Sequence, residues 1–283
     1  MINSNVTAII PCYNDEEYVL SAVNSILKQT ILPEKIIVID DGSDDITKAI
    51  LSKINNDIIE VILQDNLGVC KARNKAIDLA NTEYILTLDA DDFFESTFIE
   101  KAIYILNNNK EVGIVGCHTR SFNSLGIELK INLKKGSTVN DLLFENKGAS
   151  ASSMYRKACW EQVGGYDEKM INGYEDWEFW IAIAKKNWKT YIIKEVLFNY
   201  RVKYTSRDSV ARLEYDSELK EYIFLKHQEL YSKNIEKTIT YFFKRIKELE
   251  KRNNQLNKSI DYNLGKQILR PLRKLKNLIS NKK

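Results

Sequence analysis

The sequence predicts an α/β protein in which a mostly parallel sheet is flanked by helices. Four short runs rich in apolar and β-branched residues occupy positions 6–10, 36–39, 58–63 and 84–88. Stretches with apolar residues at helical spacing lie between these runs, and polar turn residues follow each of them. Strict alternation of strand and helix produces crossover connections, which place successive strands parallel.

Each of the first two strands is followed by a polar loop and a helix. The run at 6–10 ends at Pro11, and the apolar spacing over 19–27 predicts a helix. The run at 36–39 is broken by the sequence Asp-Asp-Gly-Ser, after which a second helix begins.

The third and fourth strands complete the alternation. A turn at 65–68 follows the strand at 58–63, and a helix over 69–80 leads to the strand at 84–88. Three carboxylates within four positions come next: Asp89, Asp91 and Asp92.

The polar loops after these strands are expected to meet at one edge of the sheet. Open α/β sheets bind ligands outside the carboxyl ends of their strands. Crowded carboxylates such as those at 89–92 repel one another, and a divalent cation with oxygen ligands would neutralise them. A solvated acidic turn that caps the next helix is the alternative. Beyond residue 92 the alternation is lost, with a strand pair expected around 112–122, a polar loop at 126–136 and a strand at 151–156.

The composition argues against several classes of protein. The net charge of +3 on 283 residues is too small to indicate a nucleic-acid-binding protein. No apolar run is long enough to span a bilayer and the amino terminus lacks a signal-peptide pattern, so a cytoplasmic location is expected. The four cysteines lie far apart in the sequence and are expected to be free thiols, while two histidines are too few for most zinc sites.

Neither glycine-rich phosphate motif, G-x-G-x-x-G or G-x-x-x-x-G-K, opens the chain. Instead, several blocks resemble those of the family 2 glycosyltransferases, sugar-nucleotide enzymes with the GT-A fold, in the family's order and spacing. The blocks are residues 6–29, 37–44, 66–76, 84–92, 164–168 and 173–178. The resemblance covers about residues 5 to 207 and implies a Rossmann-like GT-A domain with a helical extension. Its segments would be a donor-binding half at 1–100, an acceptor-binding half at 101–210 and the extension at 211–283.

The resemblance places the nucleoside of the donor at the first two loops. Pro11, Tyr13 and Glu16 would lie along it, and Asp41 would accept a hydrogen bond from a ring N–H of the base. Uracil offers such a donor, so a UDP-sugar is expected, and stacking on Tyr13 would contribute about 1–3 kcal/mol. The alternatives are a loop residue packed on the sheet end for Tyr13, and a helix cap or turn for Asp41.

Gly68, Lys71 and Arg73 are also assigned to the donor site by the resemblance. Arg73 matches the family arginine that approaches the sugar diphosphate, and a guanidinium can grip phosphate oxygens with two parallel hydrogen bonds. Exposed helix cations are the alternative for Lys71 and Arg73.

The D-x-D motif implies a metal. By similarity, Asp91 would bind Mn²⁺ or Mg²⁺ and Asp89 would contact the ribose or metal-bound water, so that the cation stabilises the leaving diphosphate. Lys203 departs from the family, because it stands where members often have a histidine ligand, and an ammonium does not bind a hard cation. Either the two carboxylates and water hold the metal, or Lys203 itself helps to neutralise the diphosphate.

Glu175, Asp176 and Trp177 open a later helix. The resemblance makes Asp176 the general base that takes a proton from the acceptor hydroxyl, which then attacks the anomeric carbon and inverts it. Base catalysis of this kind contributes about 10²–10⁴-fold. Attraction between the helix dipole and acids in the first turn would by itself explain Glu175 and Asp176. Trp177 is either a platform for a sugar ring or a core residue.

The resemblance thus predicts an inverting glycosyltransferase that transfers a sugar to a hydroxyl of a glycan or lipid-linked acceptor, in cell-surface polysaccharide synthesis. A sugar nucleotidyltransferase is the first alternative, although residues 11–17 lack the glycine- and basic-rich loop it usually needs. The second is an inactive, membrane-associated scaffold, against which the intact Asp89, Asp91 and Asp176 argue.

Beyond about residue 207 the sequence becomes helical and highly charged. Mostly apolar residues there follow the alternating four-three spacing of a coiled coil, which predicts self-association or docking on the enzyme's own surface. These positions are Ile235, Ile239, Phe242, Ile246, Leu249, Asn253, Leu256 and Ile260. Residues 266–283 interleave leucines with many cations and no acid, which suits contact with an anionic membrane at its inner face, or a solvated tail.

Overall fold

The computed structural model describes residues 4–204 and 206–269, and a sheet of nine strands forms its centre. Eight strands follow the order β3-β2-β1-β4-β8-β6-β9-β5, and β7 pairs with β6 outside this path. The strands are β1 (Val6–Cys12), β2 (Lys35–Asp41), β3 (Ile59–Gln64), β4 (Tyr84–Thr87), β5 (Phe93–Phe94), β6 (Val112–Asn123), β7 (Glu128–Asn132), β8 (Met154–Arg156) and β9 (Lys189–Val202).

The first half of the sheet is parallel, as predicted. β3, β2, β1 and β4 are neighbours with parallel ladders, and each ends within two residues of its expected limits. All seven residues of β1 are buried, because helices cover both faces of the sheet there. The carboxyl ends of β1, β2 and β4 therefore lie at the same edge.

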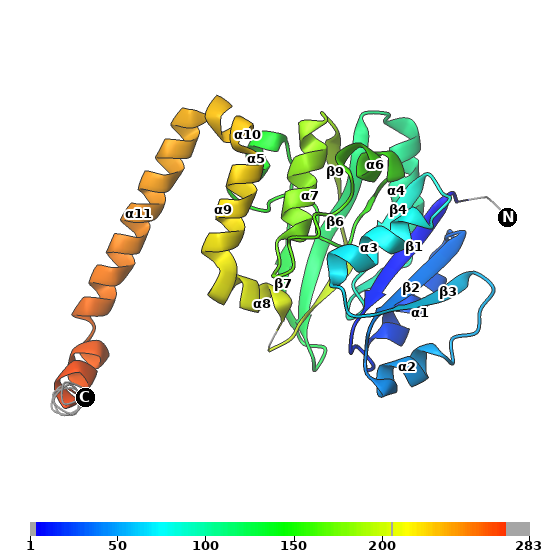
Figure 1. Ribbon diagram of the computed structural model, residues 1–283, viewed down its shortest axis with the longest axis horizontal. Helices are drawn as coiled ribbons and strands as arrows, with labels where there is room; N and C mark the ends of the chain where they lie inside the picture. The colour runs from blue at the N-terminus through cyan, green and yellow to red at the C-terminus, as the bar shows by residue number, and fades with distance from the viewer. Residues whose placement is uncertain (1–3, 205, 270–283) are drawn as a thin grey trace. The chain divides into compact units, whose positions relative to one another are not determined.

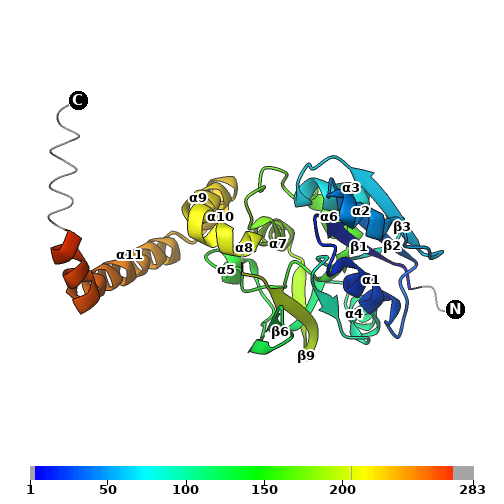
Figure 2. The ribbon, with the colours of Figure 1, turned by 90° about the horizontal axis from the view of Figure 1, so that it is seen from below.

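Helices α1 and α4 lie on one face of this sheet, and α3 and α6 lie on the other (Figures 1 and 2). Ile26 of α1 and Phe98 of α4 pack into the same core as Ile10 of β1. The helices of this part of the chain are α1 (Val19–Leu27), α2 (Asp45–Leu51), α3 (Val69–Asp78), α4 (Phe98–Asn108), α5 (Val139–Leu142), α6 (Lys157–Val163), α7 (Glu175–Lys185), α8 (Arg207–Val210), the π-helix η1 (Ala211–Tyr215) and α9 (Asp216–Lys226).

The second half of the sheet is mixed and differs from the prediction in two places. The expected strand pair around 112–122 is one long strand, β6, which runs parallel to β9 and antiparallel to β8. Residues 128–132, expected within a polar loop, form β7. None of the β7 residues is buried, so this strand lacks the apolar alternation by which strands are recognised in a sequence.

The chain divides into two compact units, the first of which runs to Lys226 and includes α8, η1 and α9. The second unit begins at His227 and contains α10 (Gln228–Lys233) and α11 (Ile235–Lys258). Helix α11 ends at Lys258 and Ser259 is extended, so Ile260 does not continue the expected coiled-coil spacing. Most of the basic segment expected at 266–283 lies outside the described residues. Within residues 4–269, leaving aside position 205, no helix is both long and apolar enough to cross a membrane.

Candidate active site

Charged side chains that follow three strands meet at the predicted edge of the sheet. Asp15 follows β1, Asp91 follows β4 and Lys203 follows β9. The Nζ atom of Lys203 lies 2.5 Å from Asp15 Oδ1 and 2.9 Å from Asp91 Oδ2. Burial lowers the pKa of Lys203, but its hydrogen bond to Asp15 and the charge of Asp91 outweigh this and raise the pKa above its usual value. The ammonium ion is therefore a fixed positive charge between two carboxylates.

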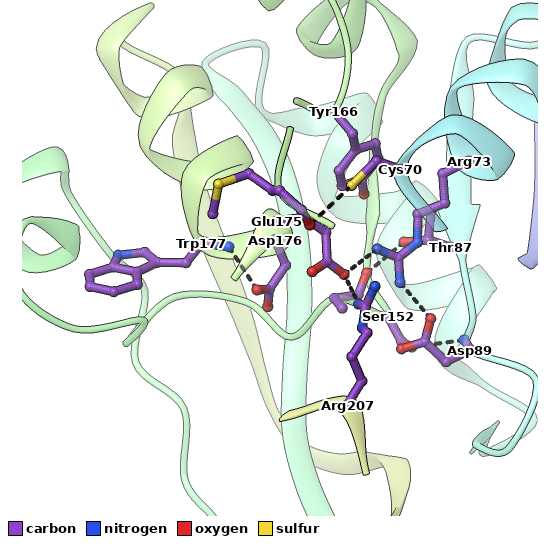
Figure 3. Close-up of polar contacts among 12 residues, drawn as sticks. Cys70, Arg73, Thr87, Asp89, Ser152, Tyr166, Glu175, Asp176, Trp177 and Arg207 are labelled. Atoms are coloured by element: carbon purple, nitrogen blue, oxygen red, sulfur yellow. Dashed lines mark hydrogen bonds and ion pairs between the residues drawn. The ribbon is translucent and has the colours of Figure 1, made fainter. Parts of the chain in front are cut away.

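A chain of ion pairs connects this edge to helix α7 (Figure 3). Arg73 of α3 is fully buried; its Nη2 lies 2.5 Å from Asp89 Oδ1 and its Nη1 lies 2.9 Å from Glu175 Oε1. Arg207 pairs with the same Glu175 oxygen. The carboxylate of Asp89 is thereby tied to the first residue of α7, from a position far away in the sequence.

The burial of Arg73 changes its expected role. Both terminal nitrogens of the guanidinium are engaged by carboxylates, and the ring of Tyr166 lies 5.3 Å from the Cζ atom. In this conformation Arg73 positions Asp89 and Glu175, and the alternative of an exposed helix cation is wrong. Direct contact between Arg73 and a diphosphate stays a prediction.

Asp176, the expected base, lies in the first turn of α7 and is partly accessible. Its Oδ2 accepts a hydrogen bond from Asn146 Nδ2 at 2.8 Å, and its Oδ1 accepts one from the backbone N–H of Trp177 at 2.7 Å. The turn before α7 is fixed by Gly173 at φ 124°, where a Cβ would come within 2.7 Å of the Ala211 side chain. Substitution of this glycine would therefore displace the start of α7 and its two acids.

Neighbouring acids in α7 have opposite pKa shifts. Burial raises the pKa of Glu175, but the charges of Arg207 and Arg73 outweigh it and lower the pKa to about 2. Burial and the negative charge of Glu175 together raise the pKa of Asp176 to about 6, against the effect of Asn146. Glu175 is thus a permanent carboxylate, whereas Asp176 can gain and lose a proton near neutral pH.

The nucleoside loops also have defined roles in the fold. The carboxylate of Asp41 accepts hydrogen bonds from Gln64 Nε2 at 2.7 Å and from the backbone N–H groups of Leu67 and Gly68 at 2.8 and 2.9 Å. Asp41 therefore holds the loop before α3, and its contact with a base stays a prediction. Gly68 has φ 91° and precedes α3 directly.

The remaining expected donor residues differ in how accessible they are. Tyr13 is 49% exposed, so its ring is available for stacking. Lys71 is exposed, whereas Pro11 is buried within β1. Glu16 accepts a hydrogen bond from the Thr47 hydroxyl at 3.3 Å, which joins the first loop to α2.

Trp177 is a core residue and not a sugar platform in this conformation. Its side chain is only 4% exposed and its indole N–H donates to the Leu142 carbonyl at 2.6 Å. Trp177 therefore supports the site by holding α5 against α7. The four cysteines are buried free thiols, as expected.

Four residues that the sequence did not single out complete the cluster: Asp15, Asn146, Arg201 and Arg207. Arg201 donates from its Nε to the Asp91 carbonyl at 2.9 Å and from its backbone N–H to the buried Asp92 carboxylate at 2.7 Å. Burial and the charges of Asp91 and Asp89 raise the pKa of Asp92 well above its usual value. Arg201 stands two positions before Lys203 in the sequence, and this closeness was the signal that could have found it.

Comparison with known sequences identifies the family. The sequence model of glycosyl transferase family 2 matches residues 7–154, which is more than half of the 283 residues. The chain belongs to this family. The matched segment contains the D-x-D motif and Arg73, and the prediction of a family 2 glycosyltransferase is confirmed.

Several family members are similar over most of the chain. TuaG of Bacillus subtilis, a glycosyltransferase assigned to teichuronic acid biosynthesis, is 28% identical over 70% of this chain and 79% of its own length. The poly-beta-1,6-N-acetyl-D-glucosamine synthase of Staphylococcus aureus is 30% identical over 70% of this chain, and chondroitin synthase of Pasteurella multocida is 25% identical over 95% of it. The chain spans 47% and 27% of the length of these two synthases.

The fold is similar to that of proteins whose structures have been solved. S. aureus TarS 1–349 in complex with UDP-GlcNAc superimposes with a TM-score of 0.60 at 22% identity, over 72% of this chain and 60% of the TarS chain. The predicted fold class, a GT-A-type sheet flanked by helices with further helices at the C-terminal side, is confirmed.

Proposed function

We propose that this glycosyltransferase moves a sugar from a UDP-sugar to a hydroxyl of a glycan or lipid-linked acceptor, with inversion at the anomeric carbon. The observation that carries the proposal is the ion-pair chain from Asp89 through Arg73 to Glu175, which ties the D-x-D motif to the residue that precedes Asp176 in α7. Support for the donor and pathway comes from the names of similar proteins. TarS has been solved with UDP and with UDP-GlcNAc, and TuaG and poly-beta-1,6-N-acetyl-D-glucosamine synthase are named for polysaccharide synthesis.

In this proposal the base stacks on the exposed ring of Tyr13, and the diphosphate lies toward the charged cluster at the ends of β4 and β9. Residues 1–100 would form most of the donor-binding half, and residues 101–210 would supply the acceptor-binding half, including Asn146 and Asp176. Lys203 would provide positive charge close to the leaving group.

Asp176 performs the proton chemistry in the proposed mechanism. Its ionised carboxylate takes the proton from the acceptor hydroxyl as the oxygen bonds to the anomeric carbon and the bond to the nucleotide diphosphate breaks. A base with a pKa of about 6 is ionised at neutral pH and still has appreciable basicity, which suits this role. Glu175, with a pKa of about 2, is too weak a base and instead orients the start of α7 through Arg73 and Arg207.

The carboxylates after β4 are the candidates for holding Mn²⁺ or Mg²⁺. Carboxylate oxygens are the ligands that these cations prefer, and Asp89 and Asp91 are both partly accessible. Among the described residues, no group of three or more His, Cys, Asp or Glu side chains is placed to hold a metal ion. Asp91 and Asp89 are the two carboxylates that would hold such a cation, and Asp89 Oδ1 also pairs with Arg73. When bound, such a cation neutralises charge on the leaving diphosphate.

Lys203 would compete with that cation for Asp91, since its ammonium already lies 2.9 Å from Asp91 Oδ2. Metal binding would require the lysine to move or to share the carboxylate. A lipid-linked acceptor would lie at the inner face of the membrane. Residues 266–283 would contact that membrane.

The proposal is tested by donor binding and by turnover. Thermal stabilisation by a panel of UDP-, GDP- and dTDP-sugars, with and without Mn²⁺, identifies the donor. Hydrolysis or transfer of the sugar from that donor then measures catalysis, and Asp176→Asn is expected to lose about 10²–10⁴-fold in turnover while binding UDP normally. Transfer at the wild-type rate by Asp176→Asn would show that the base has been wrongly assigned.

A further inference from the structure

Helix α11 presents a continuous coiled-coil stripe that the catalytic site does not use. Positions a and d of its heptads are defined by the four-three spacing from Ile235 to Leu256. The a positions are Ile239, Ile246 and Asn253, and the d positions are Ile235, Phe242, Leu249 and Leu256. The apolar side chains among them are between 46% and 55% exposed, although α11 is 24 residues long. A stripe of this length and periodicity is typical of a helix that packs against another long helix.

We infer that two copies of this chain associate through α11 as a parallel, in-register coiled coil. The choice of residues at the core positions favours two parallel strands, which prefer β-branched residues at a and leucine at d. Ile239 and Ile246 occupy a positions, and Leu249 and Leu256 occupy the last two d positions; the first two d positions hold Ile235 and Phe242.

Asn253 specifies the orientation. In a parallel, in-register pair each a position faces its own copy, so the two Asn253 amides lie together and can hydrogen-bond to each other. In an antiparallel pair, a positions face d positions, so the Asn253 amide would face an apolar side chain. Its Oδ1 accepts a hydrogen bond from Asn257 Nδ2 of the same helix at 3.4 Å, but its own NH₂ group would have no partner across the seam. The NH₂ group of Asn253 would likewise lack a partner across the contact if α11 packed on an apolar surface.

The charges beside the stripe fit the parallel arrangement as well. In parallel coiled coils a g residue pairs with the e residue five positions later on the other helix. Arg245 is at g and Glu250 is at e, so a parallel dimer forms this opposite-charge pair twice. An antiparallel pair would bring g beside g and e beside e, which places like charges together. Within one helix Arg245 Nη1 lies 3.5 Å from Glu248 Oε2, and Glu250 lies on the opposite flank of the stripe because g and e positions flank the a and d positions on either side.

Within the part of the chain that the structure describes, α10 packs against one flank of the stripe near its start. Thr238, a g residue, is buried and its hydroxyl donates to the Tyr231 carbonyl of α10 at 3.2 Å. The part open to a second copy therefore runs from Ile239 to Leu256. These 18 residues correspond to about 27 Å of helix.

The oligomeric state of the full-length protein tests the proposal. Sedimentation equilibrium over roughly 1–100 μM protein is expected to give a dimer that dissociates on dilution. Ile246→Asp would place a carboxylate in the seam of each copy and is expected to raise the dissociation constant at least about 100-fold. Thr240→Asp, which adds the same charge at an exposed b position of the same helix, is the matched control and should leave it unchanged. Far-UV circular dichroism checks that both variants keep their helix content.

Two further sets of variants test the orientation. Arg245→Glu and Glu250→Arg should each weaken the dimer, and the double variant should recover most of the affinity because the pair is exchanged between chains. Under mild oxidation Asn253→Cys should form a disulfide between copies, whereas Asn254→Cys, at b, should not, since disulfides require Cα atoms within about 7 Å. The four native cysteines are buried and should not react.

A protein that is monomeric at every concentration would overturn the proposal, as would a dimer that Ile246→Asp leaves intact. A dimer that responds to Ile246→Asp but whose Asn253→Cys variant does not cross-link would overturn the parallel register.

Discussion

The hydrogen bond from Asn146 to Asp176 gives a sharp test of the general base. The amide nitrogen of Asn146 donates to Asp176 Oδ2 at 2.8 Å, and this bond favours the ionised carboxylate against burial and the charge of Glu175. Removing the amide in Asn146→Ala should therefore raise the pKa of Asp176 further. A base must be ionised to accept a proton, so the acid limb of the activity profile should move to higher pH.

The size of that shift follows from the bond that is lost. A hydrogen bond to a charged group contributes about 1.5–3 kcal/mol, and one pKa unit corresponds to about 1.36 kcal/mol, so we expect a shift of about 1–2 units. The limb should then move from about 6 in the wild-type protein to about 7–8 in Asn146→Ala. Water entering the space of the amide would give the lower end of this range, because it can replace part of the hydrogen bond.

The assay is kcat/KM for sugar transfer measured from pH 5 to pH 9.5. At pH 7 Asn146→Ala should have about 2- to 10-fold less activity than the wild-type protein, and at pH 9 the two should be nearly equal. Asn140→Ala, which removes an exposed asparagine from the nearby α5, should show the wild-type limb. A limb that stays in place in Asn146→Ala, or activity that falls equally at all pH values, would refute the electrostatic assignment.

Three other substitutions examine the charges of the site. Asp176→Asn should stabilise the protein at pH 8 by up to about 3 kcal/mol. The folded state raises the pKa of Asp176 to about 6, so the wild-type protein loses stability as the pH rises through that value and the carboxyl ionises. Thermal unfolding at pH 8 and pH 4 should show the gain only at pH 8. Arg73→Met removes the partner of Asp89 and one of the two partners of Glu175, and it should lower the free energy of unfolding by about 3–5 kcal/mol, a fall in Tm of about 6–20 °C. Arg212→Met removes only an exposed pair with Asp208 and should change the Tm by little. Lys203→Met should weaken UDP binding about 10-fold in EDTA but strengthen the binding of Mn²⁺, both measured by calorimetry. An equal loss of UDP affinity with and without Mn²⁺ would contradict the competition between Lys203 and the metal for Asp91.

The parallel half of the fold could be predicted because its sequence signals are local. Runs such as 36–39 and 84–88 are apolar, β-rich and bounded by turn residues, and they became β2 and β4. The edge strand β7 could not be predicted in the same way. Its residues are exposed or half-buried, so its pairing with β6 depends on tertiary contact and not on an apolar pattern.

The residues of the candidate site also fall into those that local sequence signals reveal and those that only tertiary contacts reveal. Asp89, Asp91 and Asp176 belong to short motifs whose residues lie close together in the sequence. Asn146 and Arg207 lie in polar segments without a motif, and only the fold brings them to α7. Arg73 was located correctly, but its burial depends on Glu175, which lies 102 residues away. Burial of a charge can be inferred only when its partners are known.

The two acids at the start of α7 show how one local sequence supports two different functions. Glu175 and Asp176 are adjacent, and both lose hydration on folding, which raises the pKa of each. Two guanidinium groups contact Glu175, whereas Asp176 receives only neutral hydrogen-bond donors among the contacts described and feels the negative charge of Glu175. The same arginines that keep Glu175 ionised thus make it a fixed charge, and that fixed charge raises the pKa of the neighbouring base. Arg73 therefore acts on Asp176 in two opposing ways, directly as a cation and indirectly by keeping Glu175 ionised, so its removal should change both the stability of the fold and the pH at which the base ionises.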